Sequence, residues 1–304
     1  MILQESITSS HQSDSRLNYL HYLCVANEVS QHRYAELYEP EATGEVELQE
    51  DLEKILRLLE DKNPETTHLR YVWMALILAL TVKPAIDYYF PDRAIAEKTI
   101  VQLAMWLVEV IKQVPDTENR ASGSLGIQEI EIVPERIVAS LSENRKIASF
   151  QVLYEALDVY QNAVKMLDRN KSLEALLEIL EDCLEGYAIF PGASGRRELF
   201  NWWLRDVVPA SLQLRPPASI YQVENSSSGE ASAQYLLEIL NRIYYEMKFA
   251  IARLPESQAS FNRYPTKPNI PTVAKPNAYG KINTFLKNEN CYLDAVKKYY
   301  QIKI

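Results

Sequence analysis

Apolar residues recur at three- and four-residue spacing along most of the chain, which is the pattern of amphipathic α-helices. The longest apolar run, Tyr71–Val82, is about half the ~20 residues that a membrane-spanning helix needs. It therefore predicts a buried core helix and no transmembrane segment. Pro64 and Ser172 stand where helices are predicted to begin, at a first helical position and at an N-cap. The predicted helices cover residues 17–37, 48–59, 64–82, 91–111, 134–145, 153–167, 172–184, 196–208 and 236–254.

Polar and proline-rich stretches separate these helices. In the stretch 115–134, residues 127–133 alternate Ile with Glu, so this segment is either a short strand or an extended connection. Residues 255–276 are rich in proline, which favours an extended path, and an amphipathic helix is predicted beyond them. The sequence thus predicts an all-α protein with a multi-helix bundle over residues 1–254. A sub-boundary at 114–133 is an open alternative, and residues 255–304 form a proline-rich connector with a basic C-terminal helix.

Composition narrows the class of protein. The chain has only 8 Gly in 304 residues, and they form neither a dinucleotide-binding G-x-G-x-x-G nor a phosphate loop. The 3 Cys are odd in number and far apart, which favours reduced thiols over a disulfide framework. No basic and then apolar stretch opens the chain, so no secretory signal is visible. We expect a cytoplasmic protein, and the sequence identifies no cofactor.

The net charge of −9 is unevenly distributed. Residues 261–304 hold eight basic and two acidic side chains, a net of +6, whereas the rest of the chain has a net of −15. The predicted C-terminal helix places Leu286, Leu293 and Tyr300 on one side, between lysines. This segment is expected to dock on an acidic protein surface. Nucleic acid or an anionic membrane are the alternative partners of residues 261–304.

Two groups of side chains suggest small-ligand chemistry. In the first predicted helix, His21, Cys24, Glu28 and His32 lie within about 80° of one face, and all four are metal-capable. They span roughly 16 Å along the axis, so at most two or three of them can share one ion. Near residue 195, Ser194 and Gly195 precede Arg196 and Arg197 where a helix is predicted to begin, which is a candidate anion-binding turn.

Other features are typical of interaction surfaces or of ordinary helix faces. Trp202 and Trp203 follow the candidate anion turn, and large aromatic residues of this kind anchor either cores or protein interfaces. The 19 Tyr against 7 Phe also favour an interface. A stripe of glutamates on the predicted 172–184 helix is typical of a solvated face; it consists of Glu174, Glu178, Glu181 and Glu185.

No catalytic constellation can be assembled from these residues. The leading prediction is therefore a non-catalytic helical interaction or regulatory protein that binds a protein partner or self-associates. One alternative is a helical enzyme, cofactor binder or metal binder that uses the first-helix stripe or the turn at 190–200. A further alternative is a nucleic-acid or anionic-membrane binder that uses the basic C-terminal segment.

Overall fold

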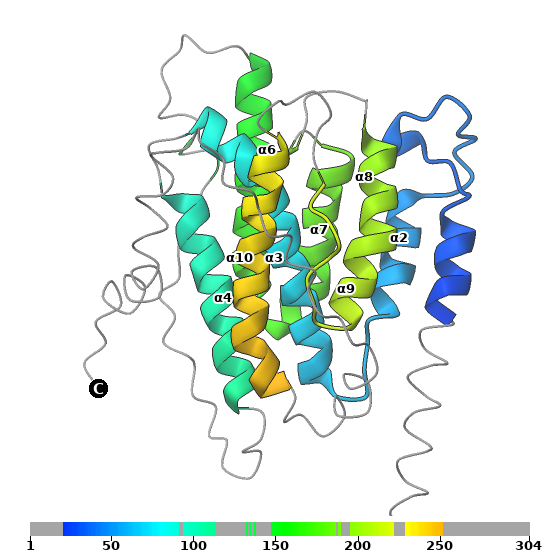
Figure 1. Ribbon diagram of the computed structural model, residues 1–304. Coiled ribbons are helices and arrows are strands. Elements are labelled where there is room, and N and C mark those ends of the chain that lie inside the picture. Colours follow the sequence, from blue (N-terminus) through cyan, green and yellow to red (C-terminus); the bar gives the residue numbers. More distant parts are fainter. Residues whose placement is uncertain are drawn as a thin grey trace, which may run out of the picture. The chain divides into compact units, whose positions relative to one another are not determined.

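The computed structural model describes residues 21–90, 94–113, 132, 134, 137, 147–186, 188–189, 195–221 and 229–251. In this part of the chain eight α-helices pack into a bundle and no strand occurs, which confirms the predicted all-α fold (Figure 1). The chain divides into two units, Met1–Phe261 and Asn262–Ile304, and every described residue belongs to the first. The predicted proline-rich connector and basic helix at 255–304 lie outside the described residues.

Helix α3 (Pro64–Tyr89) occupies the centre of the bundle. It contacts five other helices: α4 (Ile95–Gln113), α6 (Ile147–Lys165), α7 (Ser172–Leu184), α9 (Val208–Leu212) and α10 (Gly229–Ile251). Every residue from Tyr71 to Val82 is buried, so this run has no polar face to present to water. By length and composition α3 is also long and apolar enough to cross a membrane, but 89% of its most apolar window is buried inside the protein. The prediction of a buried core helix is confirmed.

The sequence sets the beginning of α3. Asn63 takes an extended backbone conformation, and its side chain accepts a hydrogen bond from the Glu65 N–H at 3.0 Å. Pro64 follows at the first helical position, where its missing N–H costs nothing. At the start of α7 the predicted cap is displaced: the Asp168 side chain caps the short turn η2 (Arg169–Lys171), and Ser172 is already helical. Ser172 instead donates its hydroxyl to the Arg169 carbonyl.

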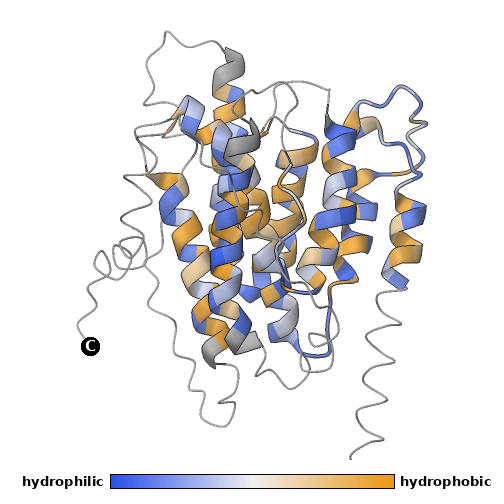
Figure 2. Ribbon diagram, viewed as in Figure 1, coloured by the Kyte–Doolittle hydropathy of each residue, from blue (hydrophilic) through white to orange (hydrophobic). Residues whose placement is uncertain are grey.

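The remaining elements enclose α3 and α7. Helix α2 (Leu48–Arg57) packs on α7, and α8 (Arg196–Trp202) leads through a wide π turn, η3 (Trp203–Val207), into α9. Pro209 lies just after this turn and has no N–H to donate to the carbonyl four residues earlier, which favours the wider winding. The predicted helix at 196–208 is thus confirmed in place but is irregular. Figure 2 shows that apolar residues are concentrated in the central helices, while the described connections are mostly polar.

Two predicted elements differ from the structure or lie beyond it. The first predicted helix is too long: of its residues, 21–29 are helical, a turn follows, and η1 (Ala35–Leu37) comes after an extended Tyr34. Its last residues leave the helix because their side chains and carbonyls bind α2 and α8, as shown below. The segment 127–133, predicted as a strand or an extended connection, lies outside the described residues except for Ile132, which is buried and neither helical nor extended in a sheet.

Because α3 is enclosed on all sides, truncating one of its central side chains is expected to be costly. Leu76→Ala removes a side chain that is fully buried, and we expect the free energy of unfolding to fall by about 2–5 kcal/mol. The matched control is Leu23→Ala, since Leu23 is 44% exposed, and its expected effect is within about 0.5 kcal/mol. Urea unfolding followed by circular dichroism measures both. Equal effects of the two substitutions would contradict the central position of α3.

Candidate functional site

A cavity of about 720 Å³ lies between η1, α6 and α7. Ten residues line it, none is basic, and six carry a carboxyl group. The acidic residues are Glu36 from η1, Glu155 from α6, and Glu178, Glu181, Asp182 and Glu185 from α7 and its end. The other lining residues are Ala35, Tyr38, Gln151 and Gly186. The cavity is therefore a concentration of negative charge contributed by three separate elements.

Helical spacing explains how α7 supplies most of this charge. Its four cavity carboxyls fall at positions i, i+3, i+4 and i+7 and so share one face of the helix. The opposite face is apolar and packs into the core through Ile179, Leu180 and Leu184. The sequence indicated a solvated stripe here. Glu174, Glu178 and Glu181 are exposed, as that interpretation expects, whereas Glu185 is partly buried. What the sequence does not show is that Glu178, Glu181 and Glu185 also line a cavity. The sequence pattern does not identify Asp182 and Glu155 as cavity residues, because no local pattern shows that α6 and η1 face this side of α7.

Burial and crowding shift the pKa values of three of these carboxyls upwards. For Glu185, burial first and then the nearby Glu181 and Glu36 raise the pKa to about 7, against a smaller opposing effect of Arg196. For Asp182, burial, a hydrogen bond with Glu155 and the charge of Asp158 raise the pKa far above its ordinary value. The pKa of Glu178 is also raised, mainly by burial and by Glu181. The cavity thus holds protonated and ionised carboxyl groups side by side near neutral pH.

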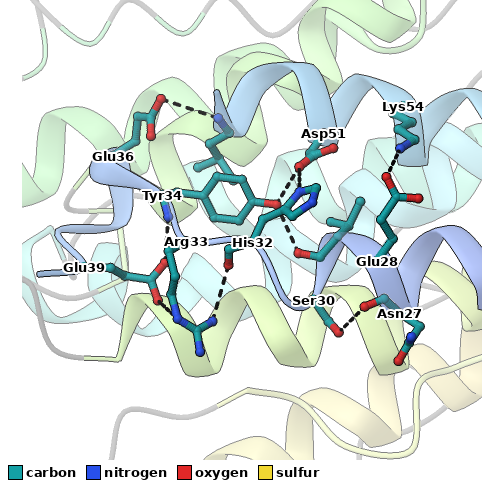
Figure 3. Close-up of polar contacts among 12 residues, drawn as sticks. Asn27, Glu28, Ser30, His32, Arg33, Tyr34, Glu36, Glu39, Asp51 and Lys54 are labelled. Atoms are coloured by element: carbon teal, nitrogen blue, oxygen red, sulfur yellow. Dashed lines mark hydrogen bonds and ion pairs between the residues drawn. The ribbon is translucent and has the colours of Figure 1, made fainter. Parts of the chain in front are cut away.

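Residues 30–46 form one side of the cavity, the wall segment, and a buried polar cluster holds this segment against α2 (Figure 3). Asp51 of α2 accepts a hydrogen bond from the Tyr34 hydroxyl at 2.8 Å, and its same oxygen lies 2.6 Å from Nδ1 of His32. Tyr34 is fully buried, and burial together with the Asp51 hydrogen bond raises the pKa of its hydroxyl far above the ordinary value. Glu36 accepts a hydrogen bond from the Leu48 N–H at 3.4 Å, at the start of α2. These contacts place Glu36 and Tyr38 at the cavity.

A second set of hydrogen bonds joins the same wall segment to α8. The Arg197 guanidinium donates to both carboxylate oxygens of Glu39 and, at 2.8 Å, to the His32 carbonyl. Burial acts to raise the pKa of Glu39, but the hydrogen bonds from Arg197 and from the Tyr34 N–H outweigh it, and the net pKa is lowered. Glu39 is therefore held as a carboxylate in a largely buried ion pair.

The two arginines of the candidate anion turn are thus engaged within the protein. Arg196 is only 1% exposed, and its guanidinium donates to the Glu185 and Gly186 carbonyls at 3.1 Å and stacks over the Tyr38 ring. Gly195 has a left-handed backbone and begins α8, whereas Ser194 lies outside the described residues. The structure brings Arg196 to the end of α7, beside the cavity, where its Nε and Nη2 donate to main-chain carbonyl oxygens. An anion site at this turn stays a prediction from the sequence.

The four metal-capable residues of the first predicted helix do not converge. His32 lies beyond the helix and pairs with Asp51, and Glu28 forms an ion pair with Lys54 at 2.9 Å. His21 and Cys24 are exposed on the helical segment 21–29. Within the described ranges, no group of three or more His, Cys, Asp or Glu side chains is placed to hold a metal ion.

The aromatic interaction candidates divide between the core and the undescribed C-terminal segment. Trp203 is fully buried, and its indole N–H points to the Met74 sulfur at 3.4 Å. Trp202 is 7% exposed and donates to the Ser219 carbonyl at 3.0 Å. The structure therefore places both tryptophans in the interior rather than on an open surface. The other three candidates, Leu286, Leu293 and Tyr300, lie outside the described residues.

Comparisons of the chain with protein-family models, with curated proteins and with solved structures gave no match. The chemistry of the cavity must therefore be argued from its own residues. Carboxylates accept hydrogen bonds from ammonium and guanidinium groups, and these charge-assisted bonds are the strong ones. Tyr38, which is 60% exposed, adds an aromatic ring at the same cavity. The arrangement is suited to organic cations.

The Arg197–Glu39 ion pair is expected to be the main interaction that holds the wall segment, residues 30–46, against α8. Arg197→Met leaves a carboxylate that is 12% exposed without its principal donor, so the free energy of unfolding should fall by about 2 kcal/mol or more. The control is Arg33→Met: Arg33 also approaches Glu39, at 3.9 Å, but is 44% exposed, and its loss should cost less than about 1 kcal/mol. Urea denaturation compares the two variants, and an Arg33 effect as large as that of Arg197 would contradict this assignment.

Glu185 is expected to make the protein less stable as the pH rises. Its pKa is raised in the folded state from 4.5 to about 7, so its favourable contribution is fully present below pH 4.5 and is lost as the pH rises through 7. Relative to the unsubstituted protein, Glu185→Gln should therefore gain stability over this interval. The expected gain is about 1 kcal/mol, because the residue is only partly buried and solvent screens its charge. Thermal unfolding across the pH series measures the gain.

Glu174→Gln is the matched control for this series, since Glu174 is exposed on the same helix but does not line the cavity. It should show a smaller change over the same pH interval. A stability difference between Glu185→Gln and the unsubstituted protein that is independent of pH would refute the assignment.

Proposed function

We propose that this protein is a non-catalytic interaction protein whose acidic cavity binds a lysine- and arginine-rich segment of a protein partner. The observation that carries the proposal is the set of six carboxyl groups from three elements around one cavity without a basic lining residue. A partner that brings cationic groups among them relieves the repulsion between the carboxylates. Binding and the relief of internal strain then act in the same direction.

The size of the cavity supports a peptide segment as the ligand. A volume of about 720 Å³ lies within the range of roughly 300–1,000 Å³ that pockets for drug-sized ligands occupy. It accommodates one or two long basic side chains with part of their backbone. Glu178 and Glu181 are exposed, whereas Glu36, Asp182 and Glu185 are partly buried, so a long side chain meets carboxyl groups at successive depths.

Tyr38 supports an alkylammonium or guanidinium ligand over a bare inorganic cation. Its backbone is left-handed, with φ 60°, a conformation that costs energy in a residue other than glycine and holds the ring at the cavity. One cation already stacks on this ring, since the Arg196 guanidinium carbon lies 4.6 Å from the ring centre. An aromatic ring beside carboxylates is the arrangement that recognises organic cations by cation–π attraction.

The other functions predicted from the sequence are not favoured by this cavity. Phosphate groups of nucleic acid or of anionic lipid are repelled by its carboxylates, so a nucleic-acid or membrane function would have to use residues 261–304. A nucleic-acid or membrane function stays a prediction from the sequence. So do self-association, enzyme or metal-binding activity, and cytoplasmic localisation.

Binding of a basic peptide to the full chain tests the proposal. Fluorescein-labelled peptides of ten residues, rich in lysine and arginine, are titrated with the protein and followed by fluorescence anisotropy, with acidic peptides as blanks. We expect the double variant Glu178→Gln/Glu181→Gln to weaken binding about tenfold or more, which corresponds to about 1.4 kcal/mol. The effect should shrink at high salt because the interaction is between charges.

The matched control is Glu174→Gln/Glu238→Gln, which removes the same charge from exposed positions of α7 and α10 outside the cavity. It should change the affinity less than about twofold, an expectation that rests on screening of distant surface charges. Equal weakening by both double variants would show attraction to net charge alone. That result, or no binding of any basic peptide, would sink the proposal.

A further inference from the structure

Asp182 of α7 and Glu155 of α6 line the same cavity, where their carboxyl groups lie close enough to share a hydrogen bond. An ionised carboxylate has only acceptor oxygens, so two carboxyl groups can form a hydrogen bond only when one of them carries a proton. One oxygen of Asp182, Oδ2, is completely buried and has no donor when both groups are ionised. A shared proton removes the repulsion between the two groups and supplies that missing donor.

The end of α7 holds Glu155 close to the backbone. A Cβ atom placed on Gly186 would lie 2.8 Å from the Asp182 carbonyl and 3.1 Å from Oε2 of Glu155. The first distance is shorter than real Cβ contacts allow, so the absence of a side chain at Gly186 permits this close approach. The Ala188 N–H also donates to the same Asp182 carbonyl, at 3.4 Å. The pair therefore joins α6 to the turn in which α7 ends.

The charged groups around the pair are nearly all negative. From α6 comes Asp158, from α7 and its end Glu178, Glu181 and Glu185, and from η1 Glu36. Two cations act on these carboxyls: Lys165 at the end of α6 acts on Glu178, and Arg196 of α8 acts on Glu185. The Arg196 guanidinium also binds the Glu185 and Gly186 carbonyls. The carboxylate of Asp51 in α2 is engaged by His32 and Tyr34, and α3 presents a buried apolar stretch. Ionising the pair would add another negative charge to this set.

We infer that Asp182 and Glu155 share a proton that fastens α6 to the end of α7, and that losing this proton opens the acidic cavity on that side. The width of the cavity then depends on pH through the protonation of two of its own lining residues. This inference is independent of what the cavity binds, because the fastening is internal to the protein.

The direction of the response follows from the environment of the pair. Burial, then the hydrogen bond with Glu155, then the charges of Asp158, Glu155 and Glu178 all raise the pKa of Asp182. A raised pKa in the folded state means that the stabilisation is fully present below the unfolded pKa and is lost as the pH rises through the folded one. The hydrogen bond between Asp182 and Glu155 is therefore present at acid and neutral pH, and it is lost at alkaline pH.

Infrared spectroscopy of the full chain without any ligand tests whether the proton is there. A protonated carboxyl group has a carbonyl band distinct from that of a carboxylate. We expect such a band at about pH 8.5, where Glu185 is mostly ionised, and its loss in both Asp182→Asn and Glu155→Gln, since an amide next to a carboxylate forms the same contact without a proton. A spectrum without the band, or a band that survives in both variants, would overturn the inference.

Hydrogen exchange tests the opening. Protection of the amides of residues 181–186, corrected for intrinsic exchange, should fall about tenfold or more between about pH 7 and pH 10 in the unsubstituted protein. Asp182→Asn should remain protected throughout, because its amide donates to Glu155 at any pH. Glu155→Gln gives the same expectation from α6 if the first variant folds poorly, and Glu174→Gln should behave like the unsubstituted protein.

Equal pH dependence of protection in Asp182→Asn and in the unsubstituted protein would contradict the inference. No peptide is present in either measurement. A result against the shared proton is therefore distinguishable from a failure of the cavity to bind a basic segment.

Discussion

The burial of α3 is the constraint on which the rest of the structure depends. From Tyr71 to Val82 this helix has no polar face, so every side of it must be covered by other helices. At roughly 25 cal/mol per Å² of apolar surface removed from water, enclosing such a run is a large favourable contribution to folding. Even its polar contacts are internal: Tyr160 of α6 donates to the Ala79 carbonyl at 2.7 Å, and Trp73 donates to the Arg215 carbonyl at 2.8 Å.

The acidic cavity is a consequence of that enclosure. Helices α6 and α7 each turn an apolar face towards α3, which leaves their polar faces side by side and close to η1. On these faces carboxyl groups from different elements meet without cations between them. An arrangement of this kind is unfavourable taken alone, and it persists because the surrounding core over-determines the positions of the helices. Strain held in this way is more typical of functional positions than of a neutral surface.

The sequence predicts the helices well and their relations poorly. Periodicity identifies α3 and α7, and Pro64 marks a helix start, because these signals are local. The end of the first helix is not local: His32 leaves it for Asp51, nineteen residues further on, and Arg197 binds Glu39 from 158 residues away. The cavity was invisible for the same reason, since Glu36, Glu155 and Asp182 share no sequence pattern. Arg196 and Arg197 indicate an anion site in the sequence, which does not show the carbonyl and carboxylate partners that the fold supplies to them.

The way in which Arg196 is held bears on how the proposed basic segment would reach the cavity as well as on how tightly it would stay. Its Nε and Nη2 donate to main-chain carbonyls at the end of α7, and its charge only partly offsets the burial and the neighbouring carboxylates that raise the pKa of Glu185. The field of the carboxylates that line the cavity extends into solvent over a Debye length, about 10 Å at 0.1 M salt. Fields of this sign draw cationic molecules towards the opening before contact and raise the rate of productive encounters. Salt then controls the speed of association, and the dissociation rate is set by the contacts made inside.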